Sequence, residues 1–276
     1  MGLAAAHPVR WHDVRVNTYR LIAALGSSFA AGPGIEPIEE AAAMRSSRNY
    51  AHQLTTLLGA ELVDLTVSGA TTANVLDTPQ QFSEQLVFPP QADGVPADAD
   101  VVTITAGGND LQFAGAMLYT AWLSADPSSP LVPMLGAMFS GGIPFPTEEA
   151  VEQATAGLVR VIEKVHTRAP DARILLVDYL TVLDDESVTA TPFTAGELAQ
   201  FLVIQNAIGR VFETAADRTV AELVRASALS VDHALGSAEP WVQPFHQDMM
   251  TTAGSFHPNE AGMTAIALEL QRVLEA

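Results

Sequence analysis

The stretch Tyr19–Phe29 (YRLIAALGSSF) decides the fold, because a run of mostly apolar residues meets a glycine and two serines. The run Tyr19–Leu25 predicts a buried strand, and Gly26 begins the turn that follows it. Further short apolar runs lie at Leu62–Val67, Asp100–Thr105 and Arg173–Val177. Runs that are apolar throughout are typical of a parallel sheet that helices cover on both faces.

Longer stretches between these runs carry apolar residues at helical spacing. They predict helices at Arg45–Leu58, Glu148–Arg168, Glu197–Arg225 and Glu260–Leu274. Ala228–Val231 is the predicted fifth strand. Because no repeat or low-complexity linker divides the chain, we expect a single domain over residues 1–276, with residues 1–18 as an amino-terminal extension.

The segment Ser124–Pro146 breaks this alternation, since it is apolar, rich in proline and glycine, and follows a strand-end loop. One interpretation is an irregular surface excursion that packs on the core. The other is a cover or wall for an apolar substrate. In the second interpretation the pocket-lining side chains are Met134, Leu135, Met138 and Phe139.

The composition narrows the class of protein. Of the 276 residues, 48% are hydrophobic, which excludes a disordered chain. The 32 acidic residues outnumber the 13 basic ones and give a formal net charge of -19. Phosphate backbones and anionic membrane surfaces repel such a chain, so we expect no nucleic-acid partner.

The sequence also bears on location. The apolar stretch Leu131–Pro146 is interrupted by prolines and glycines, so we expect no membrane insertion. The start, MGLAAAHPVRWHD, lacks the basic region and apolar core of a secretory signal, which favours a cytoplasmic protein.

The absence of cysteine excludes disulfides, thiolate nucleophiles and cysteine-based metal sites. Nothing in the sequence indicates the oligomeric state.

Ser28 is the first candidate for chemistry, because it lies three residues past a buried strand, at the edge where sites form in parallel sheets. A serine there is a nucleophile if a base reaches it, and otherwise it caps a helix. A phosphate-binding loop is the competing interpretation of this glycine-rich turn. It lacks the G-K-[ST] signature and the third glycine of a dinucleotide fingerprint.

Gly69 and Asn109 follow the next two predicted strands. Together with the N–H of Ser28, the Gly69 N–H and the Asn109 amide would form an oxyanion hole, which acyl transfer requires. Taken singly, Gly69 could be a turn residue and Asn109 the cap of a helix over Asp110–Ala121.

His257 has the best-defined setting of the seven histidines. It precedes Pro258, a residue that suits the first turn of a helix, so His257 is expected on a loop where it could act as a general base. No H-x-x-x-H pair occurs and the other histidines are scattered, so we expect no metal site.

These segments together resemble the SGNH hydrolases, also called the GDSL family, in their order and spacing. The matching segments are Gly26-Ser27-Ser28-Phe29, Gly69, Gly107-Gly108-Asn109-Asp110 and His257-Pro258-Asn259. The resemblance implies a flavodoxin-like three-layer α/β fold with a parallel sheet of about five strands. It also implies Ser28 as nucleophile, His257 as base, and Ser28, Gly69 and Asn109 as the oxyanion hole.

The chain departs from the family at the triad acid, which normally lies three residues before the histidine. That position is Gly254, and Thr251–Gly254 contains no carboxylate. We therefore predict a Ser–His dyad in which a backbone carbonyl near Gly254 orients the imidazole. Asp248, delivered by a bend of the loop, is the rival, and Glu260 is a weaker one.

The resemblance implies a serine esterase or lipase that acts on neutral carboxylic esters through an acyl-enzyme, without metal or organic cofactor. Small-molecule or lipid esters are the expected substrates. An acyltransferase or a deacetylase on the same site, or a non-catalytic binding module, remains an alternative. A flavin or nucleotide protein of the same fold is a further one, although the chain lacks a phosphate-cradling loop.

Overall fold

Five parallel strands form the central sheet, in the spatial order β4-β1-β7-β8-β9. The computed structural model describes residues 19–139 and 141–276, so the predicted extension 1–18 lies outside the described residues. The strands are β1 (Leu21–Gly26), β4 (Glu61–Asp64), β7 (Val101–Thr105), β8 (Arg173–Val177) and β9 (Glu222–Val224). β1 pairs with both β4 and β7, which is the strand order of flavodoxin-like sheets and confirms the predicted fold class.

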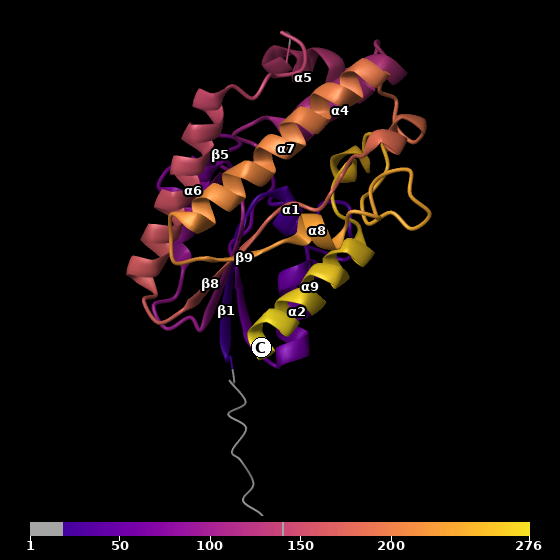
Figure 1. Ribbon diagram of the computed structural model, residues 1–276. Helices are drawn as coiled ribbons and strands as arrows, with labels where there is room; N and C mark the ends of the chain where they lie inside the picture. Colours follow the sequence, from indigo (N-terminus) through magenta and orange to yellow (C-terminus); the bar gives the residue numbers. More distant parts are fainter. Residues whose placement is uncertain (1–18, 140) are drawn as a thin grey trace, which may run out of the picture.

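Helices cover both faces of this sheet (Figure 1). One face carries α2 (Tyr50–Leu58) and α9 (Glu260–Glu275), and the other carries α3 (Thr72–Leu76), α6 (Glu148–Arg168) and α7 (Ala195–Asp217). Successive strand residues point to opposite faces, so β8 supplies Ile174 and Leu176 to one buried cluster and Leu175 and Val177 to the other. The period of two thus divides the core into two layers.

The remaining elements lie mostly around the carboxyl ends of the strands. The helices are α1 (Ser28–Ala31), α4 (Phe113–Ala125), α5 (Leu131–Phe139) and α8 (Ala226–Leu229). Two antiparallel hairpins join β2 (Ile38–Glu40) to β3 (Arg45–Ser46) and β5 (Gln80–Gln81) to β6 (Val87–Phe88). Short 3-10 turns occupy η1 (Gln91–Gly94), η2 (Asp185–Thr189) and η3 (Thr252–Gly254).

The predicted fifth strand is wrong. The fifth strand is β9, which lies inside the predicted helix Glu197–Arg225. Of the segment Ala228–Val231, the first two residues belong to α8 and the last two follow it. The helix ends at Asp217, and the Thr219 hydroxyl donates back to the Ala215 carbonyl. A three-residue edge strand directly after a long helix gives too short a pattern to be separated from it.

Two further predicted elements are also corrected. α2 begins at Tyr50 rather than at residue 45, because the Asn49 side chain accepts the N–H groups of Ala51 and His52 and caps the helix. The strand predicted over Leu62–Val67 ends at Asp64. Within Ser124–Pro146, the expected irregular structure is wrong for residues 131–139, which form α5, whereas the expected packing on the core is confirmed by the buried Phe139.

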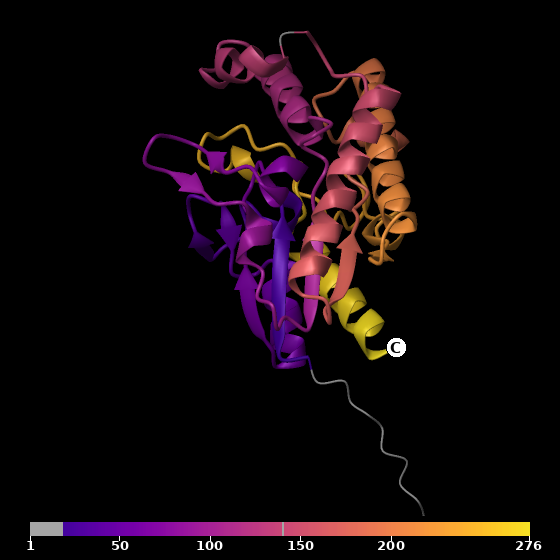
Figure 2. The same cartoon turned by 90° about the vertical axis from the view of Figure 1, so that its left-hand side faces the viewer.

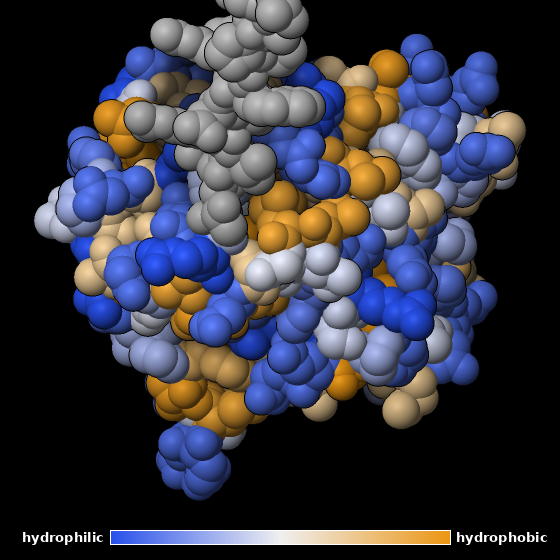
Figure 3. Space-filling view, turned by 90° about the horizontal axis from the view of Figure 1, so that it is seen from below, coloured by the Kyte–Doolittle hydropathy of each residue, from blue (hydrophilic) through white to orange (hydrophobic). Residues whose placement is uncertain are grey.

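The two ends of the sheet differ. Figure 2 shows the strands running upward, with their carboxyl ends toward the loops below α4 and α5. Seen from the opposite end, hydrophilic side chains surround separate apolar patches (Figure 3). Within residues 19–139 and 141–276, no helix combines the length and apolarity that crossing a bilayer requires.

Leu158→Ala tests the layer formed by α6. The Leu158 side chain is fully buried against the sheet, so its truncation leaves a cavity and should lower the free energy of unfolding by about 2–5 kcal/mol. Urea denaturation followed by circular dichroism measures this change.

The matched control is Leu268→Ala on α9, whose side chain is half exposed. It should change the free energy of unfolding by less than about 0.5 kcal/mol. Equal losses in the two variants would contradict the assignment of Leu158 to the core.

Candidate active site

The loops after three adjacent strands meet the loop before α9 at the carboxyl ends of the strands. Ser28 follows β1, Gly69 follows β4, and Asn109 follows β7. His257 comes from the far end of the sequence, just before α9, which begins at Glu260 with Asn259 as its cap. Residues separated by more than 200 positions are therefore brought into contact.

Ser28 contacts His257 directly. The distance from the Ser28 Oγ to the His257 Nε2 is 2.8 Å, and both residues are buried. Ser28 is the first residue of α1, and Ser27 occupies the cap position without a side-chain cap hydrogen bond. The interpretation of Ser28 as a helix cap is thus wrong, because its hydroxyl points to the imidazole.

The other ring nitrogen of His257 fixes the protonation pattern. Its Nδ1 lies 2.8 Å from the Ser255 carbonyl oxygen. A carbonyl oxygen only accepts, so Nδ1 carries the hydrogen, and the lone pair of Nε2 faces the Ser28 hydroxyl. That tautomer is the one a general base needs.

The acceptor is a backbone carbonyl, but it belongs to Ser255 and not to Gly254. The Gly254 carbonyl instead accepts the main-chain N–H of His257, at 3.2 Å. The difference of one residue arises because Phe256 adopts a φ of +63°, a left-handed conformation between the acceptor and the imidazole.

The two rival carboxylates lie elsewhere. Asp248 is exposed, and its carboxylate accepts the N–H of Met250. Glu260 is also exposed and forms an ion pair with Arg48 at 2.8 Å. In the part of the chain that the structure describes, no carboxylate is hydrogen-bonded or ion-paired to His257.

The electrostatics of His257 follow from this. Burial lowers the pKa of its imidazole from 6.5 to about 4, and the carbonyls of Ser255 and Gly254 offset the effect only in part. No neighbouring negative charge counteracts the loss of hydration of the charged form. The ring is therefore neutral at neutral pH and ready to accept a proton.

Gln243 and Phe256 hold the loop that carries His257. The Gln243 side-chain amide donates to the carbonyls of Pro33 and Pro258, and its backbone pairs with Phe256 and His257. The Phe256 ring is fully buried and stacks against Phe193. These contacts bridge the loop after α1 and the loop before α9. No sequence pattern identified Gln243, because its partners are carbonyls at other places in the chain.

Gly69 occupies a turn that requires glycine, with a φ of +82°. Gly69 is exposed. Within the described residues, neither the N–H of Gly69 nor the N–H of Ser28 donates to another group of the protein. Both groups are thus available to a ligand.

Asn109 does not cap α4, which begins only at Phe113. One hydrogen of its amide goes to the Ala70 carbonyl, at 2.9 Å, and this fixes the amide beside the Gly69 turn. The neighbouring Asp110 carboxylate accepts the N–H and the hydroxyl of Thr72. Burial raises the pKa of Asp110, and the two Thr72 hydrogen bonds counteract this. The loops after β4 and β7 are therefore joined.

Tyr179 is a residue of the site that sequence reasoning missed. It lies two residues past β8, and its hydroxyl contacts the Ser27 Oγ at 3.0 Å and the Gly108 N–H at 3.2 Å. Its ring stacks on Phe29 with centroids 4.0 Å apart. Burial raises the pKa of this phenol to about 12, so it stays neutral. Its place directly after a buried strand is the signal that could have identified it.

The four predicted pocket residues are not equivalent. Met134 and Met138 are exposed, with 61% and 69% of their surface accessible, whereas Leu135 is half-buried. Phe139 is buried and stacks on Tyr119 of α4, so it anchors α5 rather than lining an open wall.

α4, on which α5 packs, is nevertheless connected to the site near both of its ends. α4 starts four residues after Asn109, and near its other end the Trp122 indole donates to Thr252, on the loop before His257. A candidate metal cluster, Glu39, His52 and Asp64, is separate from these contacts.

Comparison with known proteins bears on the identity of the chain. Residues 24–265 match the model of the GDSL-like lipase/acylhydrolase family. A curated relative, "Lipase 2" of Streptomyces coelicolor, is 30% identical over 265 residues, which cover 91% of this chain and 84% of the relative.

Solved structures share the fold. The extracellular lipase of Streptomyces rimosus matches with a TM-score of 0.65 and 22% identity, over 92% of this chain and 98% of that one. Phospholipase A1 of Streptomyces albidoflavus matches with a TM-score of 0.66 and 18% identity, over 93% and 98%. The match along most of the chain, on a fold that brings Ser28 to His257, shows that the protein belongs to the GDSL-like lipase/acylhydrolase family and is a carboxylic ester hydrolase.

Proposed function

We propose that the protein hydrolyses neutral carboxylic esters with Ser28 as nucleophile and His257 as its base, in a dyad without a carboxylate. The observation that carries the proposal is the chain of two 2.8 Å contacts from Ser28 through the imidazole to the Ser255 carbonyl. Ser28 follows the first strand and His257 precedes the last helix, so the proposal takes the fold as one catalytic unit.

In the first step the Ser28 hydroxyl gives its proton to Nε2 of His257, and its oxygen attacks the acyl carbon. The imidazolium then protonates the leaving alcohol, the carbon–oxygen bond breaks, and an acyl-enzyme remains on Ser28. Water repeats the sequence and releases the acid. During each transfer the Ser255 carbonyl accepts from Nδ1 and partly offsets the new positive charge.

The negative charge that develops on the substrate oxygen needs fixed donors. The N–H groups of Ser28 and Gly69 and the second hydrogen of the Asn109 amide are proposed for this role. The support is that neither N–H has a partner within the described residues, and that the Ala70 carbonyl holds the Asn109 amide in place.

We propose an apolar acyl or alcohol part for the substrate, with α5 as a wall. The support is that α4 connects the Asn109 loop to the His257 loop, and that α5, which packs on α4, exposes Met134 and Met138. Two structural neighbours are a lipase and a phospholipase A1, and both names denote enzymes that act on lipid esters.

Ser28→Ala and His257→Ala test the dyad. Each should lower kcat on a soluble nitrophenyl ester by at least about 10⁴-fold, because a serine and its base act as one unit. Ser28→Ala should also abolish labelling by a fluorophosphonate probe.

Asp248→Ala is the matched control and should keep kcat within about threefold, since the carboxylate is exposed. A loss of about 10⁴-fold in this variant, the cost of a working triad carboxylate, would contradict the dyad. Absence of labelling in the folded wild type would instead favour a non-catalytic binding module.

The pH dependence of kcat/KM tests the state of His257. Because burial lowers its pKa to about 4, the free enzyme should keep its activity well below pH 6 and lose it only as the pH approaches 4. Initial rates on a neutral ester between pH 4 and 8 measure the acid limb.

The lowered pKa of His257 also makes the folded protein less stable as the pH falls from 6.5 to 4. The imidazole of the unfolded chain binds a proton near pH 6.5, whereas that of the folded protein binds one only near pH 4. The neutral, buried His257 therefore makes its full contribution to the free energy of unfolding above pH 6.5, and this contribution is lost as the pH falls toward 4. Circular dichroism at each pH therefore accompanies the rates. An acid limb centred near 6.5 in folded protein would show that burial does not govern this group.

Nitrophenyl esters from acetate to palmitate test the α5 wall. Met134→Asp with Met138→Asp should lower kcat/KM for long chains by about tenfold, equivalent to exposing roughly two methylene groups, and leave acetate unchanged. Leu268→Asp on α9 is the control, because it adds a charge at an exposed apolar position of a different helix. Equal losses on acetate and palmitate would place α5 outside the acyl path.

A further inference from the structure

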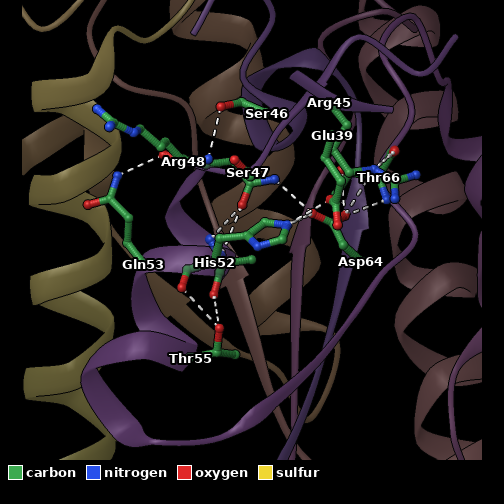
Figure 4. A network of polar contacts seen from close by, with 12 residues as sticks. Glu39, Arg45, Ser46, Ser47, Arg48, His52, Gln53, Thr55, Asp64 and Thr66 are labelled. Carbon is green, nitrogen blue, oxygen red and sulfur yellow. Dashed lines mark hydrogen bonds and ion pairs between the residues drawn. The ribbon is translucent and has the colours of Figure 1, made fainter. Parts of the chain in front are cut away.

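A second cluster of ligating side chains lies apart from Ser28 and His257, where three elements meet. Glu39 comes from β2, His52 from α2, and Asp64 from the end of β4. Figure 4 shows the His52 ring pointing toward the Glu39 and Asp64 side chains. The His52 Nε2 lies 2.9 Å from the Glu39 Oε2 and 3.7 Å from the Asp64 Oδ2, and the three atoms lie within 4.8 Å of one another.

These separations suit a metal ion. Zinc binds imidazole nitrogen at about 2.0–2.1 Å and carboxylate oxygen at about 2.0–2.2 Å, which puts neighbouring donors roughly 3.0–3.4 Å apart. The distances of 2.9 and 3.7 Å from His52 bracket that range. The remaining pair can close through Glu39, whose side chain is 44% exposed on a hairpin.

Asp64 is held as a ligand would be. Its side chain is only 4% exposed. Thr66 donates two hydrogen bonds to its Oδ1, and the Asn49 amide donates to its Oδ2 at 2.7 Å. Arg45 lies 3.6 Å from Oδ1, which leaves Oδ2 toward His52. Such outer contacts orient a ligating carboxylate and retain a lone pair for the metal.

The charge of the cluster also favours a cation. Glu39 and Asp64 carry two negative charges, and Arg45 offsets one of them. The His52 Nε2 lies within hydrogen-bond distance of the Glu39 Oε2 only, because the Asp64 Oδ2 is 3.7 Å away. A divalent ion between the three donors would relieve the repulsion between the carboxylates, which are otherwise left facing each other.

We propose that Glu39, His52 and Asp64 form a structural site for a divalent transition metal of the zinc class, completed by water on the exposed side. One nitrogen and two oxygens suit zinc better than calcium or magnesium, which take oxygen ligands. Sequence spacing gave no warning, because the ligands lie 13 and 12 residues apart on separate elements.

The site would clasp the β2–β3 hairpin to the body of the protein. The connection between these strands supplies the Ala43 carbonyl, which accepts the N–H of Ser68 directly before Gly69. The metal would thus brace the support of the Gly69 turn without touching Ser28 or His257.

Calorimetric titration of the chelator-treated full-length protein with Zn²⁺ tests the site. The wild type should bind one Zn²⁺ at this cluster, and its thermal midpoint should rise with the free Zn²⁺ concentration. His52→Ala and Glu39→Gln should each weaken this binding by at least about tenfold and remove the rise. Bound Co²⁺ should show the visible absorption of a four- or five-coordinate ion in the wild type and in neither of these two variants.

The controls are Glu40→Gln on the same hairpin and His166→Ala on α6, both exposed positions outside the cluster. They should bind Zn²⁺ as the wild type does. Glu39→Gln changes a half-exposed side chain, so it reports on the site even if His52→Ala is poorly folded. Wild-type binding no tighter than that of Glu39→Gln would overturn the proposal and leave a hydrogen-bonded histidine. Equal weakening in His166→Ala would do the same.

Discussion

A single hydrogen bond from a side chain to the main chain determines the properties of the site: the Ser255 carbonyl accepts from Nδ1 of His257. An acceptor without charge fixes the tautomer of the imidazole but stabilises its protonated form less than a carboxylate would. The bond also dictates its surroundings. Phe256 must adopt a left-handed conformation between acceptor and base, and Gln243 must pair with the backbone on both sides. A buried phenyl ring and a partly buried amide thus hold the imidazole where a triad would use a charged pair.

Much of the fold was predictable, because strands that are buried on both faces appear in the sequence as continuous apolar runs. The bounds of α6 and β8 follow from helical spacing and from a continuous apolar run. β9 was missed, since three residues at a sheet edge next to a long helix leave no separate pattern. α5 was missed because its proline and its glycine indicate a loop, whereas packing on α4 through Phe139 overrides that preference.

The predicted site divides along a similar line. Ser28 and His257 were identified by type and position, and the structure brings them together. The predicted acceptor, a carbonyl near Gly254, is one residue away from the actual acceptor, the Ser255 carbonyl. The direction of a carbonyl depends on backbone angles, which the side chains in the sequence do not reveal. Tyr179, Gln243 and Asp110 support the site through contacts between distant loops. Their partners are a serine hydroxyl, backbone carbonyls and a threonine, which spacing along one sequence does not reveal.

The division of the core into two layers has a consequence for the base. The Phe256 ring belongs to the layer of α6 and α7, whereas α9, which begins four residues later, packs its apolar side chains into the layer of α2. His257 thus stands at the seam between two halves that touch chiefly through the sheet. Slippage of either layer against the sheet would displace the imidazole from Ser28. The contact between the Ser28 Oγ and the His257 Nε2 therefore depends on the correct packing of both layers against the sheet.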